Sequence, residues 1–298
     1  MRALCYGSLN IDYVYQVPHF VSRGETLAAG ALQRFSGGKG LNQAIALARA
    51  GMEVHMAGAV GLDGDFLLDE LRDAGVDVSC VRRAACPTGH AIIQNVPDGD
   101  NCILLYGGAN RTVDRAQAEE VLARFAPGDL LLVQNEISSL ADIIALAKER
   151  GMIVALNPSP MEDALKQLPA EHIDLLILNE GEAAHSTGEA PDRPERLLAR
   201  LEEFFPDTVL VLTLGEKGSI CCDRSGMHRQ SAFRVVPVDT TGAGDTFTGF
   251  FLAAYLQDRD AAQALALASR AAAIAVTRPG AAPSIPTRAE LRAALGMR

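Results

Sequence analysis

The sequence predicts an α/β fold, a doubly wound Rossmann-type three-layer αβα sandwich around a mostly parallel sheet. Short apolar runs alternate with helical patterns along most of the 298 residues. These runs are continuously apolar rather than alternating, which is typical of strands that helices cover on both faces. Glycines at 51, 75 and 151 end three of the helical stretches, as expected where the chain turns back toward the sheet.

Apolar runs and helical periods give the elements in chain order. We predict strands at 3–6, 54–60, 130–134, 152–156, 175–178 and 209–212, helices at 41–50, 63–74 and 140–150, and further helices between the last three strands. The C-terminal third begins with an expected strand at 233–238 and continues with Ala-rich helices at 244–256, 260–276 and 287–295.

Two stretches break this alternation and predict a second, smaller sheet. Residues 13–17 and 27–35 show no helical period, and 88–95 and 102–106 flank the sequence Pro-Asp-Gly-Asp, a strong hairpin turn signal. We expect these four strands to form a small antiparallel sheet beside the main one. No Ser- or Pro-rich linker sets them apart, so we predict a single domain over 1–298. The strands of the small sheet lie within 11–36 and 87–107.

The charge balance excludes some classes of partner. The chain has 27 Lys and Arg against 37 Asp and Glu, a net charge of −10. Nucleic acids and anionic membranes require a basic surface, so we expect neither as a partner. One small anion bound at one local site remains compatible with this charge.

The cysteines and the apolar runs predict a soluble cytoplasmic protein. The six cysteines form no Cys-x-x-Cys pair and no histidine stands at metal-finger spacing, so we expect free thiols in a reducing compartment. Asn10 and Asp12 interrupt the first apolar run before a signal-peptide core is complete, and no run of about 18 apolar residues occurs.

Residues 239–245, Asp-Thr-Thr-Gly-Ala-Gly-Asp, are the most informative segment because glycines here open an apolar helix. Gly242 and Gly244 let successive backbone N–H groups point outward, and the helix N-terminus adds partial positive charge. Together they form an anion hole without Lys or Arg. The Asp245 carboxylate would face that hole, either as a general base for a substrate hydroxyl or as a simple helix cap.

A second glycine motif, Ser-Gly-Gly-Lys-Gly-Leu-Asn-Gln at 36–43, also opens a helix. Its glycines allow a ligand to approach closely, and Lys39 and Asn42 offer donors; a plain tight turn is the alternative. Asn10 and Asp12 follow the first strand, at the sheet edge where open α/β folds bind ligands. There they could bind neighbouring hydroxyls of a polyol, although Asp12 could also be a solvated loop acid.

The two motifs, in this order and separation, resemble the ribokinase family of carbohydrate kinases. The resemblance runs from residue 6 to about 286 and includes the segments 7–12, 24–26, 155–160 and 273–278. It implies an ATP-dependent kinase with a ribokinase-like core and a β-sheet lid through which two subunits form a homodimer. Small molecules, a sugar and ATP, are then the expected partners.

The resemblance also implies roles for individual residues. Asp245 becomes the catalytic base, and the backbone N–H groups of Gly242, Ala243 and Gly244 stabilise the transferring phosphoryl group. The implied sugar site comprises Asn10, Asp12, Gly38, Lys39, Asn42, Glu136 and Asp245. The implied nucleotide contacts are Asn179, Thr213, Leu214, Gly215, Glu216, Lys217, Gly218, Gly244 and Ser269.

Two cations follow from the same resemblance. Asn179-Glu180-Gly181-Glu182 matches the family's Asn-x-x-Glu element, so Glu182 would help to organise Mg²⁺, through water, on the ATP phosphates; without the resemblance, Glu180 and Glu182 are ordinary acids of a first helical turn. Activating K⁺ would lie beside the anion hole, at Asp239, Thr241, Ala275, Arg278, Gly280 and Ser284.

The resemblance favours D-ribose as the acceptor, phosphorylated on its 5-hydroxyl. A fructokinase-like or adenosine-kinase-like acceptor is the alternative, because the lid side chains that would distinguish them cannot be placed from the sequence. A non-catalytic sugar-binding protein is disfavoured by the intact motifs. A dinucleotide-dependent dehydrogenase is disfavoured because no Gly-x-Gly-x-x-Gly follows the first strand.

Overall fold

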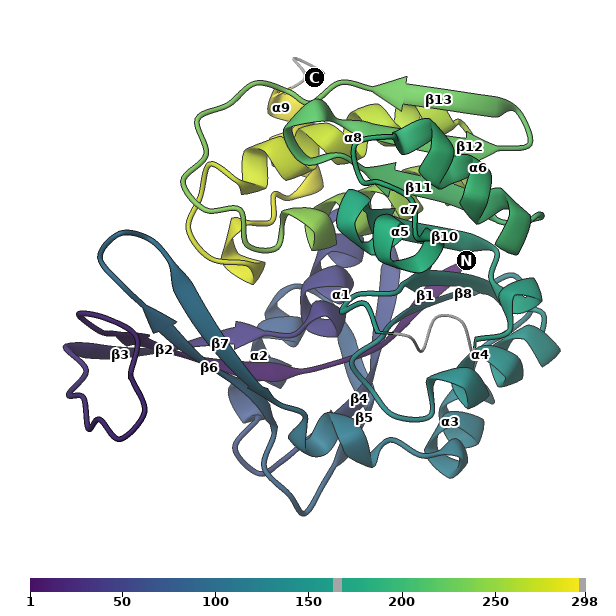
Figure 1. Ribbon diagram of the computed structural model, residues 1–298. Helices are drawn as coiled ribbons and strands as arrows, with labels where there is room; N and C mark the ends of the chain where they lie inside the picture. The colour runs from purple at the N-terminus through teal and green to yellow at the C-terminus, as the bar shows by residue number, and fades with distance from the viewer. Residues whose placement is uncertain (163–167, 295–298) are drawn as a thin grey trace.

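A nine-stranded sheet forms the centre of the molecule, in the order β13-β12-β11-β10-β9-β8-β1-β4-β5 (Figure 1). The computed structural model describes residues 1–162 and 168–294. The parallel strands are β1 (Arg2–Tyr6), β4 (Glu53–Val60), β5 (Asp77–Arg83), β8 (Leu130–Gln134), β9 (Ile153–Asn157), β10 (Leu175–Asn179) and β11 (Val209–Thr213). An antiparallel hairpin of β12 (Ser219–Asp223) and β13 (Gly226–Gln230) completes one edge.

Helices cover both faces of this sheet. One face packs against α1 (Lys39–Arg49), α2 (Asp65–Asp73), α7 (Ala243–Asp258), α8 (Ala261–Ala275) and α9 (Arg288–Ala294). The other face packs against α3 (Arg115–Leu122), α4 (Leu140–Glu149), α5 (Glu180–Thr187) and α6 (Pro194–Phe204). The expected three-layer α/β sandwich is confirmed.

Alternate strand residues enter two separate cores, which explains why the strands are apolar throughout. In β1, Ala3 and Cys5 belong to one core, whereas Leu4 and Tyr6 belong to the other. All four are fully buried. A polar residue on either face would therefore lose water without a partner.

The order of the strands creates one opening at an edge of the sheet. From β1 the chain first builds outward through β4 and β5, and later resumes on the other side of β1 with β8, β9, β10 and β11. The crossover loops after β1 and β8 therefore diverge to opposite faces. Beyond the carboxyl ends of these two strands lies the crevice in which open α/β sheets bind ligands.

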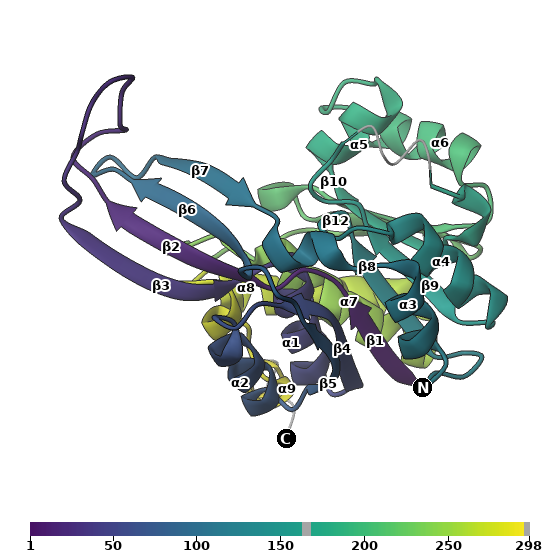
Figure 2. The same cartoon turned by 90° about the horizontal axis from the view of Figure 1, so that it is seen from below.

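A smaller sheet projects to one side of this body, as Figure 2 shows. Its order is β3-β2-β6-β7, with β2 (Asn10–Gln16), β3 (Ala31–Gly37), β6 (Gly89–Asn95) and β7 (Asn101–Tyr106). The pairs β2–β3 and β6–β7 are antiparallel hairpins, as expected. The central pair, β2–β6, is parallel, because the chain passes through α1, β4, α2 and β5 between the two hairpins.

The structure corrects the sequence prediction in places. Residues 233–238 form no strand but cross the surface, with Val236 84% exposed, and they join the body through a bond from Val238 N to Val276 O. The second lid strand begins at Ala31 rather than at 27. The β12–β13 hairpin and β5 had not been predicted. Residue 295 and part of the expected helix between β9 and β10 lie outside the described residues.

Candidate active site

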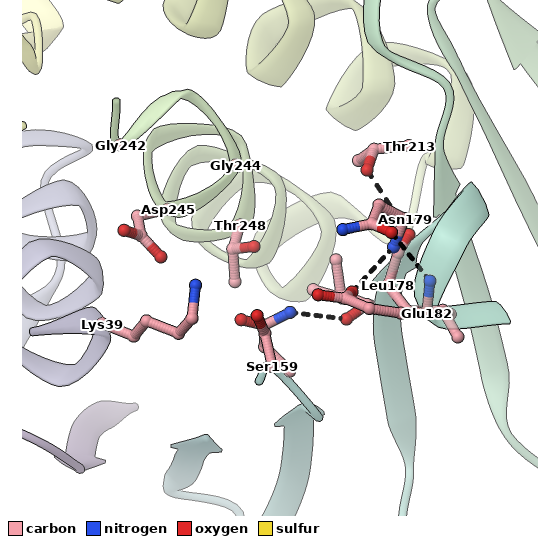
Figure 3. A pocket seen from close by; sticks show the side chains of 12 residues that line it. Lys39, Ser159, Leu178, Asn179, Glu182, Thr213, Gly242, Gly244, Asp245 and Thr248 are labelled. Atoms are coloured by element: carbon pink, nitrogen blue, oxygen red, sulfur yellow. Dashed lines mark hydrogen bonds between the residues drawn. The ribbon is translucent and has the colours of Figure 1, made fainter. Parts of the chain in front are cut away.

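A cavity of about 140 Å³ lies at the carboxyl ends of the strands, beside the N-terminus of α7 (Figure 3). It brings together residues from both glycine motifs and from three strand ends. Its lining comprises Lys39, Asn157, Ser159, Ile177, Leu178, Asn179, Glu182, Thr213, Gly242, Gly244, Asp245 and Thr248. Seven of the residues singled out in the sequence thus line one cavity.

The N-terminus of α7 presents free backbone donors to this cavity. Gly242 precedes the helix with φ +73°, a left-handed conformation that favours glycine. Ala243 N donates to Thr240 O at 3.2 Å, whereas the N–H groups of Gly242 and Gly244 meet no acceptor among the residues described. These two N–H groups are therefore available to an anion.

Asp245 does not cap its own helix. Its Oδ2 accepts a bond from Asn42 Nδ2 at 3.0 Å, and its Oδ1 accepts one from Gln43 Nε2 at 2.8 Å. Both donors are consecutive residues of α1, so the two helices hold the carboxylate between them. The side chain is only 8% exposed, yet it reaches the cavity. This geometry excludes capping, the alternative from the sequence, as the role of Asp245.

Lys39 extends into the same space as Asp245 (Figure 3). Burial opposes its charge, but the carboxylates of Asp245, Glu136 and Glu182 outweigh burial and raise the pKa of the Lys39 ammonium. The sequence had placed Lys39 among sugar contacts. Its side chain lies in the cavity with Glu182 and the α7 N-terminus, where a positive charge would also suit a phosphate.

A second cavity, of about 240 Å³, opens under the small sheet. Its lining comprises Asn10, Leu105, Gly107, Asn110, Arg111, Glu136, Pro160 and Glu162. Asn110 Nδ2 donates to Asn10 Oδ1 at 2.7 Å, and Ser8 Oγ donates to Glu136. Two predicted sugar contacts, Asn10 and Glu136, are thus held in fixed orientations at the divergent ends of β1 and β8.

Asp12, which the sequence could also place in a solvated loop, lies on β2 of the small sheet, paired with Phe35 of β3 and Ala91 of β6. Burial, reinforced by the nearby Glu136 carboxylate, raises the pKa of Asp12 to about 6. No donor meets its oxygens among the described residues, although the carboxylate lies against Gly37, where a Cβ would come within 2.2 Å of Oδ2. The ionised carboxylate is therefore poorly stabilised by the protein itself.

On the other side of the first cavity, Asn179 and Glu182 form a capping box at the start of α5. Glu182 N donates to Asn179 Oδ1 at 2.8 Å, and Asn179 N donates to Glu182 Oε2 at 2.9 Å. Glu182 lines the cavity, and its Oε1 takes no part in the capping box. The helix-cap interpretation and a role toward the cavity are therefore compatible.

The remaining predicted nucleotide contacts follow β11. Leu214 is buried, residues Gly215–Lys217 form a short 3-10 turn, and Gly218 has φ +108°. Ser269 on α8 lies behind this turn and shares a hydrogen bond of 3.3 Å with Ser219 on β12. Of this group, Thr213 is the member that lines the cavity.

The segments expected to hold K⁺ meet beside the α7 N-terminus. Asp239 accepts bonds from Thr241 N at 2.9 Å, from Thr241 Oγ1 at 2.6 Å and from Gly280 N at 2.8 Å. Burial opposes its ionisation, but these bonds outweigh burial and hold the pKa of Asp239 below its ordinary value. Ser284 is buried and donates to Ala281 O, while Arg278 pairs with Glu290 at 2.8 Å on the outside.

Comparison with known proteins agrees with this geometry. A model of the pfkB family of carbohydrate kinases matches residues 2–288. The chain belongs to this family. It is 37% identical to the ribokinase of Haemophilus influenzae over 95% of both chains, and 34% identical to that of Bacillus subtilis over 98% of both. The structure of Arabidopsis thaliana ribokinase complexed with ribose and ATP superposes with a TM-score of 0.86 at 29% identity, covering 100% of this chain and 99% of that one.

This carbohydrate kinase is thus an ATP-dependent enzyme that phosphorylates an alcohol group. Among the described residues, no three His, Cys, Asp or Glu side chains cluster as a ready metal site, and no helix is long and apolar enough to cross a membrane. All six cysteines are free thiols.

Sequence reasoning missed several polar residues around the sites. Gln43, Ser8 and Asn157 belong to segments that carry the resemblance but had no role assigned, and Asn110 and Thr248 were not considered. A weak signal existed for one of them, because Asn157 ends a buried strand just as Gln134 and Asn179 do. The partners of the others lie more than a hundred residues away, or on helices whose packing the sequence does not specify.

Proposed function

We propose that this kinase transfers the γ-phosphate of ATP to the 5-hydroxyl of D-ribose. The observation that carries the proposal is the position of Asp245, a buried carboxylate held at the N-terminus of α7 beside free backbone N–H groups. The ribokinases among its relatives, at 33–37% identity over nearly the whole chain, support ribose as the acceptor.

In the proposed reaction Asp245 accepts the proton of the sugar hydroxyl as that oxygen attacks the γ-phosphorus. The bond from the γ-phosphorus to the bridging oxygen breaks, and ADP leaves with that oxygen. The N–H groups of Gly242 and Gly244 donate to the phosphoryl oxygens while negative charge spreads over them. Ala243 N would join them only if it releases Thr240 O.

The sugar would occupy the second cavity and reach toward Asp245. Asp12 and Glu136 would accept bonds from its secondary hydroxyls, and Asn10 could accept or donate one. Asn42 would contact both the sugar and Asp245. Gly38 would allow close approach, because its φ of +95° and its contact with Ser8 exclude a side chain. ATP would lie across Lys39, Asn179, Thr213 and the 3-10 turn, with Ser269 close to its adenine ring.

Two cations fit the residues present. Glu182 has one carboxylate oxygen outside its capping box, which suits a water ligand of Mg²⁺ better than a protein cage. Asp239 and the carbonyl groups of the 239–241 and 275–284 segments offer the hard oxygen donors that K⁺ needs. When bound, the cations would neutralise phosphate charge that this acidic protein does not neutralise by itself.

The small sheet would also join two subunits. It exposes large apolar side chains, namely Leu32, Phe35, Ile103, Leu104, Leu105 and Tyr106, each at least 43% exposed. An apolar sheet with open edges is an aggregation hazard unless a partner covers it. We expect a homodimer by light scattering, and Leu104→Glu should produce monomers if this sheet is the interface.

ADP release with ATP and each of several acceptors tests the substrate. Ribose should give the highest kcat/KM among ribose, deoxyribose, fructose and adenosine; deoxyribose belongs in the set because two curated relatives, at 31% identity, are deoxyribokinases. Higher kcat/KM with another acceptor would refute ribose while leaving the family intact. Asp245→Asn should reduce kcat by at least 100-fold with sugar binding retained, and an active variant would refute the assigned base.

A further inference from the structure

A buried chain of side-chain amides runs from the core to Asp245. Gln134 ends β8, Gln43 lies on α1, and both are fully buried. Gln134 Nε2 donates to Gln43 Oε1 at 2.7 Å, and Gln43 Nε2 donates to Asp245 Oδ1 at 2.8 Å. The same Gln43 nitrogen donates to Asn157 Oδ1 at 2.9 Å, and Asn157 Nδ2 donates to Ile177 O.

The orientation of the Gln43 amide matters because its two ends are chemically opposite. With the nitrogen toward Asp245, the amide donates to two acceptor oxygens. If the amide rotated by half a turn, its own oxygen would face those oxygens, and its nitrogen would face the nitrogen of Gln134. Gln134 therefore selects the rotamer that supports the ionised carboxylate.

A glutamine at position 134 should destabilise the fold relative to an apolar residue. Its contact with Gln43 gives a functional reason for its presence. It stands where four apolar residues precede it in the strand, and its Oε1 is buried with no hydrogen-bond partner among the described residues. An unpaired buried amide oxygen destabilises a folded protein. Its nitrogen, in contrast, is committed to Gln43, with the Cys5 thiol as a distant second acceptor at 3.7 Å.

We propose that Gln134 is a positioning residue, which acts through Gln43 to fix the orientation and charge of the Asp245 carboxylate. The inference rests on the proposed role of Asp245 as base. Asn42 holds the other carboxylate oxygen, so the two α1 amides together leave the lone pairs directed at the cavity for the substrate proton. Gln134 itself is not among the residues that line the cavity.

Gln134→Met tests the proposal, because methionine keeps the length of the side chain and removes the donor. Without the Gln134 donor the Gln43 amide can turn away, and the loss of its charge-assisted bond to Asp245 predicts a fall in kcat of about 10- to 100-fold. The dissociation constants for ribose and for ADP, measured without turnover, should stay within about 2-fold. The acidic limb of the kcat profile should move to higher pH, since fewer donors stabilise the ionised carboxylate.

Gln117→Met is the matched control. Gln117 is also buried, also donates through Nε2 to a neighbour, Gly58 O at 2.8 Å, and also has an unpartnered Oε1, but it lies on α3 away from the cavity. It should lose comparable stability without the shift in pH profile. If Gln134→Met and Gln117→Met show the same kcat and the same profile, the proposal is wrong.

Two further variants separate the possible failures. Gln43→Met removes the middle of the chain and should reproduce the kinetic change of Gln134→Met, even if the latter proves too unstable to assay. Adding Gln134→Met to Asp245→Asn should cause no further loss of kcat, because both act on one group. An active Asp245→Asn would refute the base itself, whereas an additive double variant would refute only the role of Gln134.

Discussion

Asp12 tests whether a residue that binds the sugar also destabilises the sugar-free protein. Its carboxylate is largely buried, lies near Glu136 and receives no hydrogen bond from the residues described. In the folded protein its pKa is about 6, against the 3.8 of an aspartate in water. Asp12→Asn removes the charge while keeping the shape, so it should stabilise the sugar-free protein and weaken sugar binding.

The size of the gain follows from the pKa difference. A carboxyl group with a raised pKa in the folded state binds its proton more tightly there, so ionisation destabilises the fold as pH rises. About two pKa units correspond to about 3 kcal/mol at neutral pH. Residual solvent contact screens part of this, which gives an expected gain of about 1 to 3 kcal/mol. The gain should fall to about half at pH 5 and to about a fifth at pH 4, because the unfolded state, with its pKa of 3.8, begins to bind the same proton there.

Urea unfolding without sugar at pH 7.5, 6, 5 and 4 measures this gain. Asp207→Asn is the control, because its side chain is 91% exposed and its change should stay below about 0.5 kcal/mol at every pH. Ribose binding should weaken at least 10-fold in Asp12→Asn. A variant no more stable than the parent at pH 7.5, or equally stabilised at pH 4, would refute the reasoning.

Three further changes probe other parts of the site. Gly249→Ala would place a Cβ 2.4 Å from Ala46 Cβ and 2.8 Å from its backbone. Alanine usually stabilises a helix relative to glycine, but here we expect the free energy of unfolding in urea to fall by about 1 to 3 kcal/mol, together with kcat. Unchanged stability would show that α1 and α7 separate freely. Glu182→Gln preserves the capping box but not the charge. The Mg²⁺ concentration for half-maximal rate should therefore rise several-fold at constant stability. An unaltered Mg²⁺ titration would argue against a role of Glu182 in organising Mg²⁺. Replacing K⁺ by tetramethylammonium should slow the parent enzyme, and Asp239→Asn should abolish most of that difference, whereas a full K⁺ response in the variant would place the cation elsewhere.

Local patterns in the sequence were sufficient for most of the architecture. Continuously apolar runs identified six of the nine strands of the central sheet, but not β5, β12 or β13. Such runs mark strands because a strand buried on both faces needs apolar residues at every position. The two glycine motifs located the start of α1 and α7, because only a tight turn and a helix N-terminus use glycines in that way. Residues 233–238 show where this reasoning fails: their apolar character resembles a strand, but the sheet already ends at β13, so three valines remain exposed there.

The sequence by itself determined the family, most of the buried strands and the choice of Asp245 as the candidate base. Each of these depends on residues close together along the chain. Only the tertiary structure decided that Asp245 is held by α1 rather than capping α7, that Lys39 shares a cavity with Glu182 and Asp245, and that β2 and β6 run parallel. It alone revealed Gln134, whose partner Gln43 is 91 residues away. The physical reason is that a hydrogen bond depends on the positions of its two atoms in space, and those positions follow from packing of helices on the sheet rather than from spacing in the chain.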